Sequence, residues 1–338
     1  MADTHVTPDK IFQLGFGFAP SKAFLSAISL GLFTELNKSP MTAEQIRARL
    51  NLHRRGVVDF LDLLVAHGML EREDGIYSNT PACALFLDRN KPTYMGGVLE
   101  MTDARLYHFW GSFTEALQTG KPQNESKNGG PDIFAELYAD PARLRGFLSA
   151  MTGLSAGPAS VIAQKFPFQN YKSFADLGCA QGGAPVQVAL AHSHLQGIGF
   201  DLPPVQPVFE EFVAAHGLSE RLKFKAGSFM TDPLPSVDVY VMGHVLHDWD
   251  LETKMMLLRK AYDALPAGGA LIVQETLIDD DRRTHGFGLM MSLNMLVETP
   301  GGFDFTGADI QGWMKQVGFR ETRVEPLAGP DSMAIGIK

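Results

Sequence analysis

The sequence contains only two cysteines, no excess of positive charge and no long apolar run. Cys83 and Cys179 form no Cys-x-x-Cys pair, so neither a disulfide framework nor a zinc knuckle is indicated. A net charge of −9 argues against nucleic-acid partners, because phosphate binding depends on clustered Lys and Arg. No run approaches the roughly eighteen apolar residues of a membrane span, and residues 1–10 carry no signal-like apolar core. We therefore expect a cytoplasmic protein with no membrane association.

The length of 338 residues exceeds the size at which one hydrophobic core usually keeps growing, so we expect two domains. Hydrophobic residues make up 45% of the chain and charged residues 20%. This composition is ordinary for a globular protein and supplies enough apolar material for a core.

Residues 11–36 are unusually apolar for a segment near a chain end, and they include Phe12, Phe16, Phe18 and Phe24. Such a surface must be covered, because large apolar patches are rarely left open on a monomer. We interpret the segment as a dimer element. The alternative is a helix that packs into the core of its own chain.

Residues 40–88 have the pattern of a winged helix, with three short helices and a β-hairpin. Thr42 and Gln45 form a capping box, and Glu-Asp-Gly at residues 73–75 forms the hairpin turn. A winged helix can bind DNA. Between residues 41 and 80, however, six acidic side chains accompany five basic ones, so the segment has no positive face. We expect a structural role.

Helices are also predicted over residues 94–101, 104–119, 131–138 and 141–166. The second of these is rich in aromatic side chains, among them Phe109 and Trp110. Aromatic residues at this density usually belong to a core. We expect some of them to face a cleft, because this part of the chain leads directly into the next domain.

Beyond residue 171, strand patterns alternate with helix patterns to the end of the chain. This alternation predicts a mostly parallel sheet with helices on both faces, which binds ligands at the carboxyl ends of its strands. Two predicted strands end at Asp176 and Asp201, and others span residues 222–226, 237–242, 270–277, 321–325 and 332–337. Helices are predicted at residues 185–192, 208–216, 251–265 and 287–297, with a last one between Thr306 and Gly318.

A glycine turn follows the strand that ends at Asp176. Gly178 and Gly182 lack Cβ, so backbone can pass close to a ligand there. The spacing lacks the middle glycine of Gly-x-Gly-x-x-Gly, which a pyrophosphate requires. Asp201 ends the next strand, where a carboxylate can accept hydrogen bonds from two ribose hydroxyls. The pattern indicates an adenosine pocket and favours S-adenosylmethionine over NAD.

His247 follows the predicted strand at residues 237–242. Imidazole titrates at about pH 6.5, so we expect His247 to be largely the free base at neutral pH and able to accept a proton. Glu275, at the end of the following strand, and Asp304, before the last helix, reach the same edge of the sheet. A carboxylate bonded to the far ring nitrogen fixes the tautomer. There is no Gly-x-Ser-x-Gly motif, so we predict a base with orienting carboxylates and no serine nucleophile.

Two other interpretations concern the same region. His244, His247 and Asp248 could hold a metal ion, but no further ligand cluster is evident, and we predict no metal site. Met291 and Met295 lie at helical spacing on the predicted helix at 287–297. They belong either to a core or to a pliable apolar wall of a substrate pocket.

From about residue 10 to its end, the chain resembles the S-adenosylmethionine-dependent O-methyltransferases related to plant caffeate and acetylserotonin methyltransferases. The matching motifs are Asp-Leu-Gly at 176–178 through Gly182, Phe-Asp-Leu-Pro at 200–203, Gly-Ser-Phe at 227–229, Leu-His-Asp-Trp at 246–249 and Gly-Gly at 301–302. The resemblance implies a doubly wound, seven-stranded Rossmann-like methyltransferase sheet in residues 166–338. It also implies a mainly helical, winged-helix-like dimerisation domain in residues 1–165, a homodimer joined through that domain, and His247 as general base held by Glu275 and Asp304.

Some positions depart from the family pattern. Cys179 and Ala180 stand where glycines are usual, and Gly243 and His244 stand at positions near the cofactor that are often basic. Ser228 replaces an Asp that contacts the adenine amino group, so we expect that contact to be weakened or replaced.

Asp304 replaces a Glu and is one methylene shorter, so we expect its contact with His247 to be loose or water-bridged.

The predicted reaction moves a methyl group from S-adenosylmethionine to a hydroxyl of an aromatic or polyketide-like small molecule. C-, N- or S-methylation with the same cofactor site is the nearest alternative. A non-catalytic S-adenosylmethionine-sensing dimeric regulator and an NAD-dependent reductase are more distant ones.

The predicted site residues fall into two groups besides the three catalytic ones. Those expected to bind the cofactor are Ser155, Asp176, Gly178, Gly182, Asp201, Leu202, Gly227, Ser228, Phe229, Gly243, His244 and Trp249. Those expected to bind the acceptor are Phe109, Trp110, Phe134, Met291, Asn294 and Met295. Their apolar and aromatic character suits a flat hydroxylated molecule.

Overall fold

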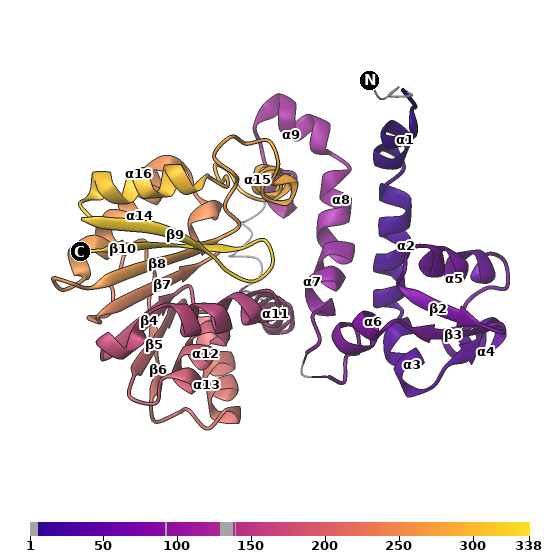
Figure 1. Cartoon of the computed structure of the whole chain (residues 1–338), viewed down its shortest axis with the longest axis horizontal. Helices are drawn as coiled ribbons and strands as arrows, with labels where there is room; N and C mark the ends of the chain where they lie inside the picture. Colours follow the sequence, from indigo (N-terminus) through magenta and orange to yellow (C-terminus); the bar gives the residue numbers. More distant parts are fainter. Residues whose placement is uncertain (1–5, 92, 129–137, 139) are drawn as a thin grey trace, which may run out of the picture. The chain divides into compact units, whose positions relative to one another are not determined.

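A computed structural model describes residues 6–91, 93–128, 138 and 140–338 (Figure 1). The chain divides into two compact units, Met1–His108 and Phe109–Lys338. The sequence pattern predicts a later domain boundary, after residue 165. The difference arises because α11 (Pro141–Lys165), which ends at that boundary, packs against α12 (Gly183–Ala191) of the sheet unit.

The N-terminal unit is mainly helical and contains a small antiparallel sheet with the strand order β1-β3-β2. The predicted capping box is present, because Thr42 and Gln45 each accept a hydrogen bond from the other's backbone N–H. The predicted hairpin is also present and turns at Asp74 and Gly75, both with positive φ. The elements are α1 (Asp9–Gly15), α2 (Phe18–Ser29), α3 (Leu32–Lys38), β1 (Met41–Thr42), α4 (Ala43–Arg49), α5 (Val57–Ala66), β2 (Leu70–Glu73), β3 (Ile76–Asn79), α6 (Pro81–Phe86) and α7 (Gly96–Met101).

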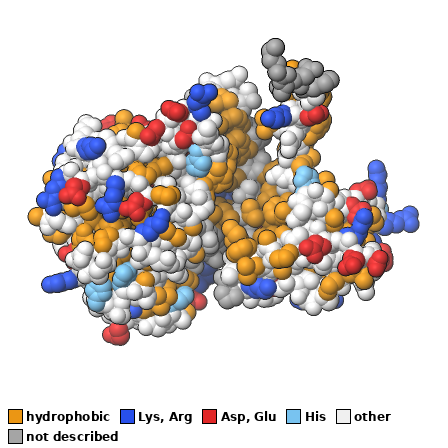
Figure 2. Space-filling model, viewed as in Figure 1, with side chains coloured by type: hydrophobic (Ala, Val, Ile, Leu, Met, Phe, Trp, Pro, Cys, Tyr) orange, Lys and Arg blue, Asp and Glu red, His pale blue; other side chains and the backbone are white. Residues whose placement is uncertain are grey.

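Apolar side chains of α1 and of the start of α2 are exposed on this unit, whose surface is drawn in Figure 2. Phe12, Phe16 and Phe18 are between 57% and 63% exposed, and the rings of Phe12 and Phe16 stack on each other. By contrast, Ile28 and Phe33 from the following turns belong to the unit's own core. The segment interpreted as a dimer element thus leaves its first apolar turns uncovered within the unit.

The second unit is built on a seven-stranded sheet with the order β6-β5-β4-β7-β8-β10-β9. Strands β4 to β8 are mutually parallel, and β10 runs antiparallel to both β8 and β9. This arrangement confirms the predicted Rossmann-like sheet. The chain winds outward from β4 in one direction and from β7 in the other, so their carboxyl ends flank the usual ligand crevice. The strands are β4 (Ser173–Leu177), β5 (Gln196–Asp201), β6 (Leu222–Ala226), β7 (Val239–Gly243), β8 (Ala270–Glu275), β9 (Glu321–Pro326) and β10 (Ser332–Ile337).

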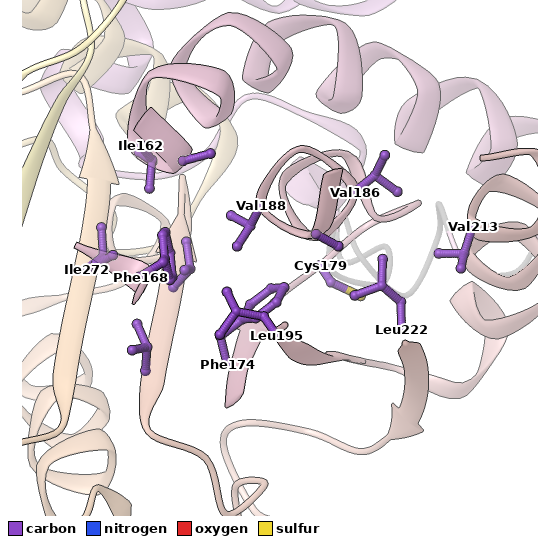
Figure 3. Close-up of a cluster of buried hydrophobic side chains, with 14 of the residues drawn as sticks. Ile162, Phe168, Phe174, Cys179, Val186, Val188, Leu195, Val213, Leu222 and Ile272 are labelled. Atoms are coloured by element: carbon purple, nitrogen blue, oxygen red, sulfur yellow. The ribbon is translucent and has the colours of Figure 1, made fainter. Parts of the chain in front are cut away.

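Helices cover both faces of this sheet (Figure 1). On one face, Phe174 of β4, Val188 of α12 and Leu222 of β6 belong to a buried apolar cluster whose side chains gather between strands and helices (Figure 3). On the other face, Leu258 of α14 and Ile310 of α16 form a second cluster. The remaining main helices are α13 (Gln206–Ala215), α14 (Leu251–Ala264), α15 (Gly286–Glu298) and α16 (Gly307–Val317).

The helix α11 is long and apolar enough to cross a membrane by length and composition alone. Its side chains Leu144, Leu148 and Ile162 belong to the first apolar cluster of the sheet unit. One side of this helix therefore packs into the core of the sheet unit.

The predicted single helix at residues 104–119 is interrupted. A π-helical turn, Thr102–Leu106, leads into α8 (Tyr107–Trp110), and Gly111 with the following residue separates α8 from α9 (Phe113–Thr119). Glycine is a poor helix former, which accounts for the break. The helix predicted at residues 131–138 lies, apart from its last residue, outside the described residues.

Candidate active site

The glycine turn after β4 has backbone conformations that favour glycine. Gly178 and Gly182 have φ of +80° and +97°. A Cβ at Gly178 would lie 2.9 Å from Val245, and one at Gly182 would lie 2.9 Å from the Phe209 ring. The packing of this chain therefore requires both glycines, in addition to any ligand that approaches the turn. Asp176 is buried at the end of β4, and burial raises the pKa of its carboxyl to about 7.

Asp201 ends β5 beside this turn and is 7% exposed. Its Oδ2 accepts a hydrogen bond from the Ala180 N–H at 2.9 Å, and its Oδ1 accepts one from the Leu202 N–H at 2.7 Å. Burial raises the pKa of Asp201 to about 6, so the carboxylate is mainly ionised at neutral pH. Because a carboxylate oxygen can accept two hydrogen bonds, Oδ2 keeps one position for a ribose hydroxyl.

Thr152 and Ser155 lie one turn apart on α11. Thr152 Oγ1 is buried and has no hydrogen-bond partner among the described residues. A Cβ at Gly183, the first residue of α12, would lie 2.9 Å from the Thr152 methyl group. An unpartnered hydroxyl beside a helix N-terminus fits a polar or charged ligand group. Ser155 is among the cofactor residues predicted from the sequence and Thr152 is not, although residues three apart share a helix face.

The turn after β6 carries the residues expected near adenine. Phe229 and Trp249 lie edge to face, with ring centres 6.3 Å apart. The Ser228 N–H donates to Asp232 Oδ2 at 2.8 Å. A Cβ at Gly227 would also lie 3.3 Å from Asp232. Asp232, which sequence analysis did not single out, therefore supplies a carboxylate to the turn where Ser228 offers only a hydroxyl.

His247 lies in the short 3-10 helix Leu246–Asp248 after β7, and it is 7% exposed. Its Nδ1 lies 3.3 Å from Asp304 Oδ1 and 3.7 Å from Glu275 Oε2, and its Nε2 lies 3.6 Å from Asp248 Oδ1. The structure thus brings the three predicted catalytic residues together and adds a fourth, Asp248. The 3.3 Å contact to Asp304 is longer than a strong charge-assisted hydrogen bond.

The His247 ring is more basic than an isolated imidazole. Burial disfavours the charged form, but the carboxylates of Glu275, Asp248 and Asp304 outweigh this effect and raise the pKa of His247 to about 9. The expectation that His247 is largely the free base at neutral pH is therefore wrong. Three carboxylates around one ring stabilise the imidazolium.

Glu275, at the end of β8, is buried at 1% exposure. Its Oε1 accepts hydrogen bonds from the N–H groups of Leu246 and His247, at 3.0 and 3.3 Å. Its Oε2 has no hydrogen-bond partner in the described part of the chain. Burial opposes ionisation, but His247 and His244 outweigh it and lower the pKa of Glu275. This carboxylate is therefore held ionised by two imidazoles.

His244 directly follows β7 with a φ of +51°. Its Nε2 lies 3.0 Å from Asp331 Oδ2, and its Nδ1 lies 3.5 Å from Glu275 Oε2. His244 is predicted from the sequence to bind the cofactor, whereas in the structure both of its ring nitrogens face carboxylates of this chain. Asp331 was not singled out. It reaches the site because β10 pairs with β8 in a register that aligns Ser332 with Glu275.

Lys254 of α14 is fully buried beside the loop that carries Asp304. Its Nζ donates to the Trp249 carbonyl and lies 3.5 Å from the centre of the Phe303 ring and 5.6 Å from that of Phe305. Burial lowers the pKa of Lys254 to about 8 against the pull of nearby carboxylates. Its burial is not evident from the sequence, because a lysine in an amphipathic helix is ordinarily exposed.

His244, His247 and Glu275 each place one possible ligand atom within 4.8 Å of the others. The geometry thus adds Glu275 to the histidine pair weighed from the sequence. Imidazolium rings between the carboxylates of Asp304, Glu275 and Asp331 account for these distances without a metal ion. The absence of a metal stays a prediction.

The aromatic residues predicted to bind the acceptor lie at the start of the second unit. Trp110 Nε1 donates to Asn294 Oδ1 at 3.0 Å, and its ring stacks on Phe113 at 4.8 Å between centres. Phe109 is half-buried beside it. Phe134 lies outside the described residues. Two of the predicted acceptor residues, 184 positions apart, are thus joined by a hydrogen bond.

Met291 and Met295 lie on α15, which packs against the 3-10 helix of His247. Met295 is buried and Met291 half-buried. Ser292 on the same helix accepts a hydrogen bond from the Asp304 N–H at 3.1 Å. This helix therefore adjoins the histidine–carboxylate cluster around His247.

A Rossmann-like sheet with a buried carboxylate at the end of β5 and a histidine–carboxylate cluster at the same edge is typical of enzymes that bind an adenosine-containing cofactor. The chain matches the O-methyltransferase domain over residues 110–320 and the O-methyltransferase dimerisation domain over residues 12–89. It belongs to the family of S-adenosylmethionine-dependent O-methyltransferases, which confirms the resemblance seen in the sequence.

Relatives match along the whole chain. The tetracenomycin polyketide synthesis 8-O-methyl transferase TcmO of Streptomyces glaucescens is 41% identical over 99% of this chain and 98% of its own. The N,N-dimethyltransferase OxyT of Streptomyces rimosus is 35% identical over 97% of this chain and 96% of its own. Human N-acetylserotonin methyltransferase in complex with SAM superposes with a TM-score of 0.90 at 25% identity, covering 100% of this chain and 99% of that one. S-adenosylmethionine is accordingly the cofactor.

Proposed function

We propose that this chain methylates a hydroxyl of an aromatic or polyketide-like small molecule, with His247 as the general base and Glu275 and Asp304 as its orienting carboxylates. The position of His247 carries the proposal. It follows β7 at the same carboxyl edge of the sheet as Asp201, and its Nδ1 lies within 3.7 Å of both carboxylates. A base so placed faces whatever binds at that edge.

The residues at this edge suit both partners of the reaction. S-adenosylmethionine supplies a methyl group on a positively charged sulfur. Asp201 and the glycine turn would hold its ribose and amino-acid end, Phe229 would pack against its adenine, and Thr152 would bind a polar group near the turn. We assign the chemistry to the sheet-bearing part, residues 166–338, with α11 completing its cofactor site.

The ring nitrogens of His247 have different tasks. Nδ1–H donates to Asp304, and Glu275 is a nearby counter-charge, which leaves Nε2 to accept the proton of the acceptor hydroxyl. Because the pKa of His247 is about 9, the ring is mainly an imidazolium at neutral pH and must lose a proton before it can act as a base. Alignment of donor and acceptor contributes on the order of 7–11 kcal/mol, and general-base help adds roughly 10²–10⁴-fold. Positioning is therefore the larger effect.

We infer the acceptor class from the predicted acceptor-binding residues and from the relatives. Trp110, Met291 and Met295 offer an aromatic face and two pliable apolar side chains, which suit a flat polycyclic molecule. The relative TcmO is named for a polyketide 8-O-methylation. These two observations support a phenolic polyketide as the acceptor.

The dimerisation domain supports a homodimer joined through the N-terminal unit. In this proposal the exposed side chains Ile11, Phe12, Phe16 and Phe18 are covered by the second copy. Burying them against a partner removes apolar surface from water, which favours association.

A second candidate is N-methylation, because OxyT is named as an N,N-dimethyltransferase. An amine attacks through its own lone pair, so His247 would matter less at a pH where the amine is neutral. A phenol needs its proton removed as the bond forms. The dependence of the rate on His247 therefore separates the two candidates.

The test is methyl transfer from labelled S-adenosylmethionine to a panel of phenols, polyketides and amines, read by mass shift. With a hydroxyl acceptor, His247→Asn should lower kcat about a hundredfold or more. Its affinity for S-adenosylhomocysteine should stay close to that of the wild type. His216→Asn, at an exposed histidine of the same unit, is the matched control. A His247→Asn enzyme that keeps most of its kcat would overturn the assignment.

A further inference from the structure

A second histidine shares a carboxylate oxygen with His247. Glu275 Oε2 lies 3.5 Å from His244 Nδ1 and 3.7 Å from His247 Nδ1. The centres of the two imidazole rings are 5.6 Å apart. Asp331 and Asp304 close the row at its two ends, at 3.0 Å from His244 Nε2 and 3.3 Å from His247 Nδ1. Imidazoles and carboxylates therefore alternate along five side chains.

Asp331 is a fixed anchor for this row. It is 6% exposed, and besides His244 it accepts hydrogen bonds from the Gln274 side-chain amide at 2.9 Å and from the Thr276 hydroxyl at 2.7 Å. Gln274 and Thr276 flank Glu275 on either side in sequence. The same stretch of chain thus orients both carboxylates between which His244 lies.

The two carboxylates determine the charge of His244. Burial disfavours the imidazolium, but Asp331 and Glu275 outweigh it and raise the pKa of His244 well above its ordinary range. His244 and His247 are therefore like charges with one shared counter-charge. When one of the two imidazole rings is protonated, its charge makes the other ring harder to protonate.

Further charged groups act on this pair from the surrounding elements. Lys254 of α14 is coupled to the carboxylates of the cluster, and Asp248 lies 3.6 Å from His247 Nε2. Among the described residues, the charged side chains that act on the two histidines or on their carboxylates are Asp248 from the 3-10 helix, Lys254 from α14, Glu275 from β8, Asp304 from the loop before α16 and Asp331 from the turn before β10.

We propose that His244, anchored by Asp331, is a positioning residue for methyl transfer that limits the basicity of His247 through their shared Glu275. The inference rests on the proposed general-base role of His247. Without His244, the full charge of Glu275 would act on His247 alone, and the base would hold its proton to higher pH. His244 thereby widens the pH range in which the base is free.

The experiment compares wild type, His244→Asn and His244→Lys. Asparagine tolerates the positive φ at this position and removes the charge, whereas lysine restores a cation. Removing a unit charge about 5–6 Å away should move the titration of His247 upward by on the order of one to two pH units at an effective dielectric of 20 or more. The acid limb of kcat/KM should move with it in His244→Asn and return toward the wild-type position in His244→Lys.

A second readout does not depend on activity. Nitrogen-15 NMR of the histidine rings should show His244 of the wild-type enzyme as an imidazolium at pH 7, and His247 titrating later in His244→Asn. A neutral His244 at pH 7, or an unshifted His247 titration in a folded His244→Asn enzyme, overturns the inference. If His247→Asn retained activity, the proposed function would fail while the NMR titration still decided the coupling. His216→Asn serves as control in both measurements, and His244→Gln replaces His244→Asn should the latter not fold.

Discussion

The ammonium group of Lys254 lies 3.5 Å from the centre of the Phe303 ring, the residue directly before Asp304. Phe305, directly after Asp304, presents its ring at 5.6 Å. A desolvated cation over an aromatic face gains about 2 kcal/mol. One buried lysine thus holds both neighbours of a carboxylate that contacts His247.

Replacing Lys254 with methionine should release this loop while keeping most of the buried volume. We expect kcat to fall roughly tenfold or more, because a small displacement of an orienting group is costly in a preorganised site. The affinity for S-adenosylhomocysteine should change little. Steady-state kinetics and calorimetry measure the two quantities, and the exposed Lys315→Met provides the control. An unchanged kcat in a folded Lys254→Met enzyme would show that the loop needs no such contact.

The reaction should speed up with pH on the alkaline side of neutrality. The reactive form of His247 is the neutral one, and with a pKa of about 9 its fraction rises nearly tenfold per pH unit below that value. Asp304→Asn removes one of the carboxylates that raise this pKa. Its acid limb should therefore move to lower pH, while the plateau rate falls because orientation is lost. Profiles of kcat/KM for the cofactor test both effects, with Asp281→Asn on the surface as control. A wild-type profile that is flat from pH 6 to 9 would contradict the prediction.

Cofactor affinity should depend on the ionised carboxylate of Asp201. Asp201→Asn keeps the size of the side chain but removes its charge and one acceptor. A hydrogen bond to a charged group contributes about 1.5–3 kcal/mol, so affinity for S-adenosylhomocysteine should drop about 10- to 100-fold. Since the pKa of Asp201 is about 6, wild-type affinity should also weaken as the pH falls below that value. Calorimetry at several pH values measures this, and Asp263→Asn is an exposed control. Equal affinities for wild type and Asp201→Asn would place the ribose elsewhere.

The state of association should depend on the exposed phenylalanines of α1 and its flank. Phe12→Glu combined with Phe16→Glu puts two charges into the apolar surface that the proposed homodimer buries. We expect a monomer in analytical ultracentrifugation at concentrations where the wild type is a dimer. Leu190→Glu alters a similarly exposed leucine, 56% accessible, on α12 of the other unit, and it should leave association unchanged. A double variant that sediments like the wild type would point to another interface.

The positions of the main site residues could be foreseen because they depend on local pattern. Asp201 and Glu275 each end a run of buried strand residues, and His247 follows a third such run. Parallel strands carry their carboxyl ends to one edge of a sheet, so the sequence placed the three together. The capped helix after Thr306 and the hairpin at residues 73–75 rest on equally local signals.

The ionisation of the site could not be foreseen in this way. The pKa of an isolated imidazole pointed to a neutral His247. In the fold, the adjacent Asp248 and the distant Glu275 and Asp304 together raise the pKa of His247 to about 9. The burial of Lys254 could not be predicted either, because its position on α14 does not indicate which distant loop covers it.

The sequence by itself determined the class of fold, the cofactor and the edge of the sheet where Asp201, His247 and Glu275 lie, because hydrophobic period and turn residues act over a few neighbours. Only the tertiary structure decided that two histidines share Glu275 and that Asp331 anchors one of them. The contact between Asp331 and His244 depends on the position of β10, which lies antiparallel between β8 and β9. Strand insertion and register are settled by the packing of the whole sheet, and no local pattern records them.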